Sequence, residues 1–595
     1  MMSTLEKYDR LKKEGKKTEG GLTEEEKKAR NLLKKKEKEK ERSLAKSKKD
    51  EKEKERLKKE KEKLFSSLSS ELKELSSLPA AIKVKVSNIY DFIGQRIVIR
   101  GWAAKIRQQG LSTMFVALRD GSIRERHYAA LATPDGEKKG EAKMEKYERV
   151  VIPTSLVTTM VQCVLTGECS RTLEAKTISR ECYLEIKGRV KSVFMSASTT
   201  ASAGKSTETA TLASTAGEDI EIVVDYWKQL GASDKDISAR YNSKSSVQQL
   251  ADERPLVLRE ERQTLIFKVM GKLAQSIRTF MDEKDVSEVF PPILGEMEVE
   301  GSETLMRVDY FDKKNVTLSQ SGQLYLQMAL RMLSSVYVIA RSFRAEKSRS
   351  RRHQTEFDHF EAEMITDLPE LLNFIEELVC YVSRFLLDKC GPIVKQFNPD
   401  FKVPQRPFPK MTYHEAIKYC GEHGIMRQQP RTASADGEEK DEREDHEKPY
   451  DLVPIVEGDD LVESVERQIV DKVGTPLFLT KFRKCDKAFY VKEEEGKEEE
   501  EKEPLSQSAD LLMPGVGETF GSGIREDSYE KIVAACKQKG LTGPQYSWFC
   551  ELNKYGSVQT GGFGMGMQRF MCWVLKLPHI RDVTMLERTI TRVSP

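Results

Sequence analysis

The segment Phe343–Met364 constrains this chain most, because it places cations, anions and an aromatic ring directly behind an apolar run that ends at Ser342. Guanidinium groups bind phosphate oxygens bidentately, whereas carboxylates bind an amine or a metal. The cations are Arg344, Arg351, Arg352 and His353, and the anions are Glu346, Glu356, Glu361 and Glu363. A buried strand followed by both kinds of charge predicts a ligand that carries a phosphate and an amine, such as ATP together with an amino acid.

The alternative for this segment is a solvated helix whose charges pair three and four residues apart. The pattern favours a binding site, since the charges begin where the apolar run stops and Phe357 stands among them, where its ring could stack on a base. In the order FRAE, RRH and EF, the segment resembles motif 2 of the class II aminoacyl-tRNA synthetases, which is a strand-loop-strand unit.

Bulk composition limits the remaining possibilities. The chain has 595 residues, enough for roughly two to four domains with a large core. It is 33% charged but carries a net charge of only +3, so a nucleic-acid surface must come from local patches. No run of about 18 apolar residues is present, and the 10 cysteines form no CxxC pair. We therefore expect a soluble, cytoplasmic protein with reduced thiols and no membrane contact.

Shifts in composition divide the chain into three parts. Residues 1–78 are rich in Lys and Glu and predict a charged helical extension, either a solubilising tail or a nonspecific tRNA-binding arm. Residues 86–231 contain five short alternating segments, which predict an OB-fold β-barrel. An insertion at 122–158 and a Ser/Thr/Ala loop at 196–217 interrupt that barrel. Residues 245–595 form the larger domain.

Two further motifs flank motif 2 in the larger domain. Apolar residues from Ile266 to Met281 recur at helical spacing and precede the strand VSEVFPPIL, which resembles motif 1, the dimer element of the family. Glycines at 561, 562, 564 and 566 precede Arg569 and resemble motif 3. A second helix is expected at Pro369–Asp388, and the acidic stretches 432–447 and 493–503 read as solvated insertions. The ordered motifs imply an α+β fold with the antiparallel sheet of a class II catalytic domain.

The order of barrel and catalytic domain resembles the subgroup of asparaginyl, aspartyl and lysyl enzymes. Aspartyl enzymes carry a lysine for the substrate carboxylate where this chain has Leu326. A buried carboxylate without its cation is costly, so Leu326 favours a neutral substrate side chain. The segments SRSRRH, HFEAEM and Ser508–Arg525 also resemble the asparaginyl form. The resemblance implies that ATP and Mg²⁺ are used to attach asparagine to tRNA(Asn), in a homodimer built through motif 1.

The resemblance also implies roles in nucleotide binding. Arg344 and Arg569 are expected to be catalytic, with Arg344 on the α-phosphate and the substrate carboxylate. Phe357 and Arg569 are expected to sandwich the adenine. Asp510 and Glu518 are expected to carry Mg²⁺. The full set expected to bind ATP is Arg344, Glu346, Arg352, His353, Phe357, Glu518, Gly566 and Arg569.

For the amino acid, the resemblance implies an ammonium pocket at Ser321, Gln323 and Glu361. Arg525 is expected to donate to the side-chain carbonyl oxygen, and either Glu361 or Glu363 is expected to accept from the amide nitrogen. In the barrel, the residues expected at the anticodon are Phe115, Gln162, Arg107 and Arg119. Without the family, Phe115 would read as a core aromatic.

Several positions depart from the family pattern. They are Gln568 and Thr560 around motif 3, Ser522 and Gly523 in the strand before Arg525, and Glu587 near the C-terminus. None removes an expected contact to phosphate or amino acid, so we expect activity. Two rivals remain: a nondiscriminating aspartyl enzyme, which Leu326 disfavours, and a catalytically silent relative that binds RNA.

Overall fold

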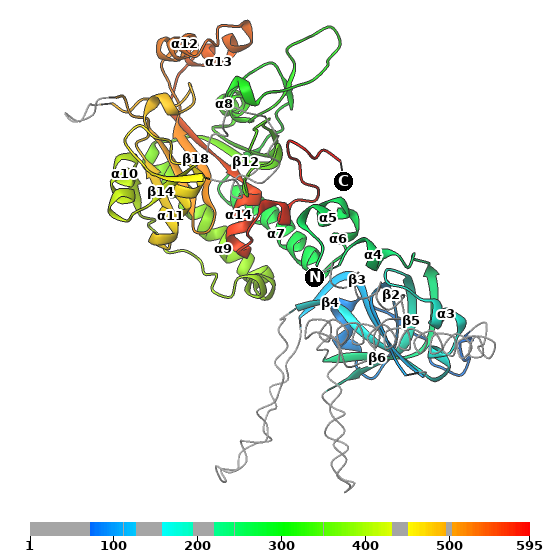
Figure 1. Cartoon of the computed structure of the whole chain (residues 1–595). Coiled ribbons are helices and arrows are strands. Elements are labelled where there is room, and N and C mark those ends of the chain that lie inside the picture. The colour runs from blue at the N-terminus through cyan, green and yellow to red at the C-terminus, as the bar shows by residue number, and fades with distance from the viewer. Residues whose placement is uncertain are drawn as a thin grey trace, which may run out of the picture.

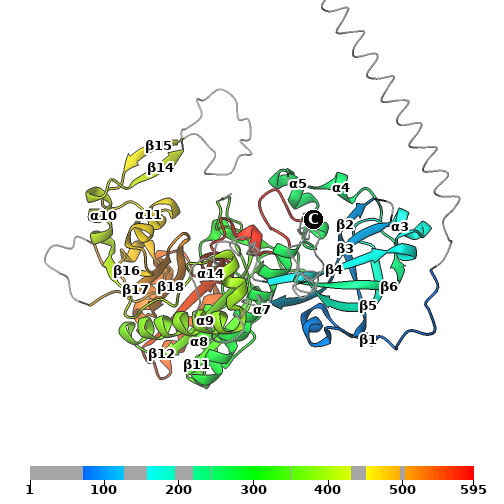
Figure 2. The same cartoon turned by 90° about the horizontal axis from the view of Figure 1, so that it is seen from below.

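A computed structural model describes residues 72–110, 112–125, 157–193, 219–242, 244–348, 350–430, 450–495 and 503–594. Most of the expected extension 1–78 and of the insertion 122–158, all of 196–217 and 432–447, and residues 496–502 of the second acidic stretch lie outside these ranges. Figures 1 and 2 show a barrel and a larger sheet domain, joined by short helices. No helix in the described ranges combines the length and the apolarity needed to cross a bilayer.

The N-terminal domain is a closed five-stranded barrel. Its strands are β2 (Arg96–Gln109), β3 (Thr113–Glu125), β4 (Val157–Thr166), β5 (Tyr183–Ser192) and β6 (Ile220–Gly231). The strand order is β2-β3-β4-β6-β5, and pairing of β2 with β5 closes the barrel, while the short β1 (Ile82–Lys83) adds to the edge of β2. Strand β4 runs parallel to β6, and α3 (Leu173–Thr177) lies between β4 and β5 in the chain. This is the arrangement expected of an OB-fold.

Short helices connect the barrel to the larger domain. They are α4 (Ile237–Arg240), α5 (Val247–Asp252) and α6 (Arg254–Val257), and they lead into α7 (Glu261–Glu283) (Figure 1). The first residue of α7, Glu261, accepts hydrogen bonds from Thr159 N at 2.7 Å and Thr158 Oγ1 at 2.8 Å. The start of the long helix is therefore bonded directly to barrel strand β4.

An eight-stranded sheet forms the larger domain, in the order β13-β16-β17-β18-β19-β12-β11-β7. Neighbouring strands are antiparallel from β16 to β11, and only the outermost pairs are parallel. The strands are β7 (Ser287–Glu288), β11 (Ser335–Phe343), β12 (Glu356–Ile365), β13 (Lys410–Thr412), β16 (Leu477–Thr480), β17 (Ser508–Met513), β18 (Gly517–Ile524) and β19 (Thr560–Gly566). The predicted α+β fold with an antiparallel catalytic sheet is thus confirmed.

The main core lies between this sheet and three helices, α7, α9 (Leu368–Phe397) and α14 (Met567–Leu575). The predicted apolar stripe of α7 is buried, with Met270 only partly so. Helix α9 starts at an Asp367 side chain that accepts from Glu370 N at 2.9 Å, and it runs past the expected end at Asp388 across a non-helical Cys390. It therefore spans more of the sheet than its sequence pattern predicts.

The strand predicted at the end of motif 1 is much shorter than expected. Only Ser287–Glu288 pairs with β11, and Leu294–Gly295 forms β8 of a separate small sheet with β9 (Met306–Arg307) and β10 (Thr317–Leu318). Pro291 and Pro292 stand between the two pieces, and neither has an N–H group to donate to a neighbouring strand. The two prolines account for the interrupted pairing.

The remaining elements lie around the sheet. Helix α8 (Gln323–Leu333) buries Leu326 and Leu330 against Val336 and Val338 of β11. Inserted between motifs 2 and 3 are α10 (Tyr413–Glu422), β14 (Met426–Pro430), β15 (Tyr450–Pro454), α11 (Glu463–Val473), α12 (Tyr529–Gln538) and α13 (Ser547–Glu551). Strands β14 and β15 form a hairpin of their own, and α11 packs against β17 and β18.

Candidate functional site

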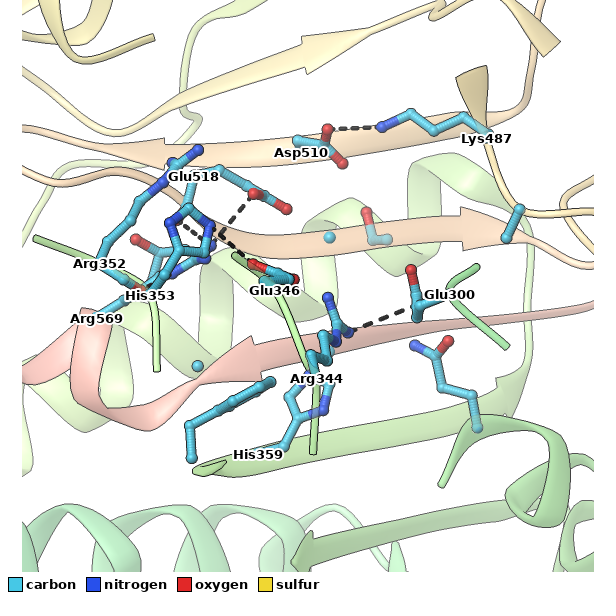
Figure 3. A pocket seen from close by; sticks show the side chains of 18 of the residues that line it. Glu300, Arg344, Glu346, Arg352, His353, His359, Lys487, Asp510, Glu518 and Arg569 are labelled. Carbon is cyan, nitrogen blue, oxygen red and sulfur yellow. Dashed lines mark hydrogen bonds and ion pairs between the residues drawn. The ribbon is translucent and has the colours of Figure 1, made fainter. Parts of the chain in front are cut away.

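A cavity of about 280 Å³ lies on the central sheet (Figure 3). Side chains reach it from the loop between β11 and β12, from β17, β18 and β19, and from the start of α14. The predicted residues that line it are Arg344, Glu346, Arg352, His353, Phe357, Asp510, Glu518, Gly566 and Arg569, together with Gln323 and Arg525. Every residue predicted to bind ATP or metal is thus brought to one cavity.

The register of the strands explains this convergence. Strands β11 and β12 pair from Phe343 opposite Glu356 to Ser335 opposite Met364, so the charged loop between them sits at one end of a continuous ladder. Strand β19 then pairs with β12 through its glycines. A Cβ atom at Gly564 would lie only 2.6 Å from His359 Nε2. Because the glycines of motif 3 have no side chains, they leave room beside β19 for the side chains of β12.

The cations of the cavity converge on Glu518. Arg569 Nη1 donates to Glu518 Oε2 at 3.2 Å and to the carbonyl oxygen of Glu518 at 3.1 Å. Burial alone would raise the pKa of Glu518, but Arg569 and Arg352 outweigh it and lower that pKa to about 2. Arg344 lies across the cavity, 3.7 Å from Glu300 and with its guanidinium carbon 5.5 Å from the centre of the Phe357 ring. This end of the site presents three guanidinium groups, those of Arg344, Arg352 and Arg569, which suit the oxygens of a polyphosphate.

His353 lines the cavity but differs from its expected role as a fixed cation. Burial, with the charges of Arg569 and Arg352 added, lowers the pKa of His353 to about 3. Its Nε2 lies 3.4 Å from Glu346 Oε2. At neutral pH the ring is therefore uncharged, and it can offer a phosphate oxygen a hydrogen bond but no positive charge.

The two carboxylates predicted to hold a metal lie on neighbouring strands and face one point. A Cβ atom at Gly521 would lie 3.5 Å from Glu518 Oε1 and 3.8 Å from Asp510 Oδ1. Lys487 Nζ donates to Asp510 Oδ2 at 2.6 Å, yet burial still raises the pKa of Asp510 to about 7. No group of three or more potential ligands gathers in the described part of the chain. A divalent ion would thus have two carboxylates and would need further oxygens from its ligand.

The other end of the cavity is lined by Gln323 and Arg525, joined through a tyrosine. Tyr490 donates to Gln323 Oε1 at 2.7 Å, and the guanidinium carbon of Arg525 lies 5.1 Å from the centre of the Tyr490 ring. Tyr490 is buried, and burial raises its pKa, so the hydroxyl keeps its proton. The amide nitrogen of Gln323 and the guanidinium of Arg525 are thereby held at the same wall.

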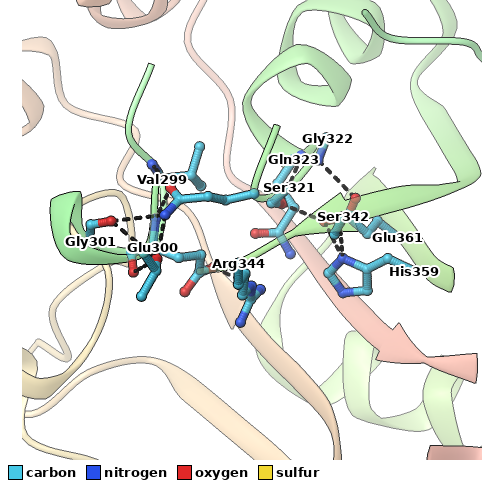
Figure 4. Close-up of polar contacts among 12 residues, drawn as sticks. Val299, Glu300, Gly301, Ser321, Gly322, Gln323, Ser342, Arg344, His359 and Glu361 are labelled. Atoms are coloured by element: carbon cyan, nitrogen blue, oxygen red, sulfur yellow. Dashed lines mark hydrogen bonds and ion pairs between the residues drawn. The ribbon is translucent and has the colours of Figure 1, made fainter. Parts of the chain in front are cut away.

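Ser321, Glu361 and Glu363 lie behind this wall, and the two glutamates have different partners. Glu361 accepts from Ser321 Oγ and, at 2.8 Å, from Gly322 N, at the start of α8 (Figure 4). Glu363 forms a bidentate ion pair with Arg525. Of the two carboxylates considered for the substrate amide, Glu363 is therefore the counter-ion of Arg525, whereas Glu361 has no arginine or lysine within ion-pair distance in the described structure.

Several residues of the cavity were not predicted from the sequence, among them Glu300, His359, Lys487 and Tyr490. His359 belongs to the HFEAEM segment and alternates with Phe357 on one face of β12, so strand alternation could have placed it there. Glu300 has no such signal. Its backbone N donates to Gln320 Oε1 at 3.0 Å, and this buried amide helps to hold the loop beside Arg344 (Figure 4).

The departures from the family pattern each have partners in the structure. Gln568 donates to Asp358 Oδ2 at 2.6 Å and accepts from Asp358 N at 3.2 Å, so it ties α14 to β12. Thr560 donates to Gln327 Oε1 at 3.2 Å, and Ser522 donates to the Ala509 carbonyl at 2.6 Å. Glu587 lies 3.2 Å from Arg592 and outside the cavity. None of these side chains blocks the space between the phosphate cations and Arg525.

The anticodon candidates lie on the barrel, and the structure separates one of them from the rest. Phe115 pairs with Arg107 across β2 and β3, with the guanidinium carbon 4.7 Å from the ring centre. Gln162 lies on β4 on the same face, two residues from the partner of Phe115. Arg119, by contrast, forms a buried ion pair with Glu181 and lines a different cavity, between the barrel and the connecting helices.

Known proteins resemble this chain over most of its length. The family model described as tRNA synthetases class II (D, K and N) matches residues 246–589. The cytoplasmic asparagine--tRNA ligase of Dictyostelium discoideum is 34% identical over 526 residues, which cover 88% of this chain and 69% of that protein. The cytoplasmic enzyme of Homo sapiens is 31% identical over 527 residues, which cover 88% and 81% of the two chains.

Solved structures give the same result. The Entamoeba histolytica asparaginyl-tRNA synthetase in complex with asparaginyl-adenylate superposes with a TM-score of 0.68 at 30% identity, covering 87% of this chain and all (100%) of that one. The Pyrococcus horikoshii asparaginyl-tRNA synthetase complexed with asparaginyl-adenylate superposes with a TM-score of 0.65 at 29% identity, covering 85% and 97%. The chain therefore belongs to the asparagine--tRNA ligase family of the class II tRNA synthetases.

Proposed function

We propose that this chain attaches asparagine to tRNA(Asn) in two steps. The carboxylate of asparagine attacks the α-phosphorus of ATP, which gives asparaginyl-adenylate and pyrophosphate, and the terminal ribose hydroxyl of the tRNA then takes the acyl group as AMP leaves. The observation that carries the proposal is the single cavity with phosphate cations at one end and the paired Arg525 at the other.

For the first step, the chain supplies position and charge. Arg344 stands between the two ends of the cavity, where its guanidinium can contact both the α-phosphate and the attacking carboxylate. Carboxylates around it, Glu300 first, outweigh burial and raise the pKa of Arg344, so it stays charged throughout. Arg569 and Phe357 can hold the adenine between them, and Arg352 and His353 can contact the outer phosphates. Such positioning accounts for most of the acceleration in phosphoryl and nucleotidyl transfer.

Asp510 and Glu518 are the residues that would hold Mg²⁺. Two converging carboxylates fit this ion, because Mg²⁺ keeps several waters and takes its other ligands from phosphates. When bound, the ion would neutralise part of the triphosphate charge. Lys487 already neutralises Asp510 in part, so the chain itself keeps the two carboxylates from repelling each other fully.

Selection of the amide is assigned to Arg525, which lines the cavity. The guanidinium would donate to the side-chain carbonyl oxygen of asparagine. The buried carboxylates behind it, Glu361 and Glu363, would oppose the negative charge of an aspartate side chain. Leu326 is fully buried in a cluster with Leu330, Val336 and Val338, so position 326 offers no cation to a substrate carboxylate.

In this proposal, the barrel contacts the tRNA anticodon and motif 1 contacts a second copy of the chain. Phe115 and Arg107 form a surface on which an unstacked anticodon base could stack, and Gln162 lies on the same face of the barrel but is only 5% exposed. Phe290 and Phe311 are 84% and 92% exposed near motif 1, so apolar surface is available there for a second copy of the chain. We propose a homodimer through this surface, and a cytoplasmic location as in the relatives' names.

Amino-acid-dependent exchange between ATP and pyrophosphate tests the function. Exchange with asparagine, and little with aspartate, is the expected result. Preference for aspartate would overturn the proposal in favour of a nondiscriminating aspartyl enzyme. Absence of exchange with both amino acids, while tRNA still binds, would favour the catalytically silent RNA-binding alternative.

A further inference from the structure

Glu466 lies on α11, in the segment inserted between motifs 2 and 3, and contacts two elements of the cavity without lining it. Arg352 Nη1 donates to Glu466 Oε2 at 2.6 Å, and Glu518 N donates to the same oxygen at 3.1 Å. The glutamate is 8% exposed. One buried carboxylate oxygen therefore joins the motif 2 loop to strand β18.

The same helix binds the β17–β18 hairpin at a second point. Asp471 Oδ1 accepts from Gly515 N at 2.6 Å, in the turn between the two strands. Asp510 and Glu518 stand on those strands, so α11 holds the hairpin that carries both proposed metal ligands. At Gly517, where φ is 89°, a Cβ atom would lie 3.0 Å from Glu466 Oε2 and 3.1 Å from Arg352 Nη1. The chain leaves room here only for the ion pair.

The charge of Glu466 matters because Arg352 stands between two carboxylates. Its side chain is only 10% exposed, and both Glu466 and Glu518 stabilise its positive charge. Glu463, the next acid on α11, is 4.0 Å away. If Glu466 were neutral, the most favourable electrostatic interaction left to the Arg352 guanidinium would be with Glu518, and the side chain would turn toward it. That turn would move the guanidinium off the outer phosphates and would compete with Arg569 for Glu518.

We infer that Glu466 is a positioning residue for the nucleotide, which holds Arg352 toward the outer phosphates and leaves Glu518 free for Arg569 and the metal. The inference rests on the proposed function only in that the nucleotide is ATP. It assigns a role in ATP binding to α11, which itself supplies no lining residue to the cavity.

Three variants of the full chain test this role. Glu466→Gln removes the charge and keeps an acceptor, Glu466→Asp keeps the charge on a shorter side chain, and Glu422→Gln makes the same exchange at an exposed position of α10. Binding of ATP with Mg²⁺ is measured by calorimetry, and KM values for ATP and asparagine by pyrophosphate exchange. Thermal unfolding checks that each variant is folded.

Glu466→Gln is expected to weaken ATP binding and to raise KM for ATP about tenfold or more, in keeping with loss of a charge-assisted contact. Its KM for asparagine should stay within about twofold, because Arg525 and Gln323 are untouched. Glu466→Asp should recover part of the affinity, and Glu422→Gln should match the parent protein. Half-maximal exchange in Glu466→Gln should also require more Mg²⁺.

Unchanged ATP binding in a folded Glu466→Gln variant would overturn the inference. Equal rises in both KM values would also overturn it, since they would indicate a general structural defect. Calorimetry needs no amino acid, so it remains informative if the parent protein fails to exchange with asparagine. In that case the proposed function fails while the role of Glu466 is still decided by ATP affinity.

Discussion

Arg525 donates from Nε, at 3.1 Å, and from Nη2 to the two carboxylate oxygens of Glu363, and both side chains are buried, at 5% and 0% exposure. Gln327 Nε2 donates to the same carboxylate at 2.7 Å. Nη1 takes no part in this ion pair, although Arg525 lines the cavity. Glu363 thus fixes the plane of the guanidinium, and one edge of it is directed to a ligand.

Loss of Arg525 is expected to remove asparagine recognition and to spare the nucleotide. Because a hydrogen bond to a charged donor contributes about 1.5–3 kcal/mol, Arg525→Ala should lower kcat/KM for asparagine-dependent exchange about 10- to 150-fold. ATP affinity, measured by calorimetry, should stay within about twofold of the parent protein, because the phosphate cations are unchanged.

The double variant Arg525→Met, Glu363→Gln provides the control for that experiment. It removes both charges, so no unpaired carboxylate is left inside the protein, a situation that costs about 3–5 kcal/mol. If the double variant unfolds at the same temperature as the parent protein and still lacks exchange, the loss of exchange results from the missing contact between Arg525 and the substrate. Exchange at the parent rate in this variant would show that Arg525 has no part in amino-acid selection.

The part of the site that lies on strands could be predicted from the sequence, because successive side chains of a strand point to opposite faces of the sheet. Once the motif 2 segment is a strand-loop-strand unit, Glu361 and Glu363 must share one face of β12 and meet β19. The assignment of ATP and metal residues rests instead on the resemblance to the class II motifs, because Arg344, Arg352 and His353 lie on the loop between β11 and β12.

The surroundings of several other residues could not be predicted, because contacts with distant parts of the chain determine them. Glu300 lies beside Arg344 because its loop is held by the side chain of Gln320 and by a hydrogen bond from Ala345 N to the Thr304 carbonyl oxygen. Arg119 looked like an anticodon residue by its strand, but the connecting helices place Arg259 beside Glu181 and draw Arg119 into the same ion-pair cluster. The sequence pattern suggested that His353 is a cation, but its burial, together with the charges of Arg569 and Arg352, lowers its pKa and keeps the ring neutral.

His359 is expected to make stability depend on pH. Burial lowers the pKa of His359 to about 3, far below its ordinary value of 6.5, so the folded protein holds it neutral. The unfolded chain binds a proton at higher pH, so this contribution to stability is complete above about pH 6.5 and is lost as pH falls toward 3. At about 1.4 kcal/mol per pH unit, the loss between pH 6.5 and pH 5 is about 2 kcal/mol.

Unfolding of the full chain in urea at pH 7.5 and pH 5 measures this dependence. His359→Asn keeps an amide near Ser342 Oγ, which lies 2.9 Å from His359 Nδ1, but it cannot take up a proton. Its stability should fall less than that of the parent protein over this range, by about 2 kcal/mol. Parallel pH profiles for the two proteins would refute the assignment.

Gly562 is expected to tolerate no side chain. A Cβ atom there would overlap the carboxylate of Glu363 and the Ala362 carbonyl oxygen, and the second contact is backbone that cannot turn away. Gly562→Ala should therefore destabilise the catalytic domain by about 1–3 kcal/mol and reduce asparagine-dependent exchange, because Arg525 moves with Glu363. Gly271→Ala, in α7 with nothing within 4 Å, is the control and should raise stability slightly. Equal melting temperatures for the two variants would show that a side chain at position 562 is not crowded.

Phe115→Ala is expected to separate tRNA binding from adenylate formation. A stacked base contributes about 1–3 kcal/mol, so affinity for tRNA(Asn) should fall about tenfold or more, measured at fixed salt. Pyrophosphate exchange without tRNA should be unchanged, since no residue of the barrel strands lines the cavity. Arg119→Ala makes the informative comparison. It breaks the ion pair with Glu181, so it should lower the melting temperature more than Phe115→Ala does. If Phe115→Ala left tRNA affinity unchanged, the ring would serve only the barrel, as its sequence alone suggests.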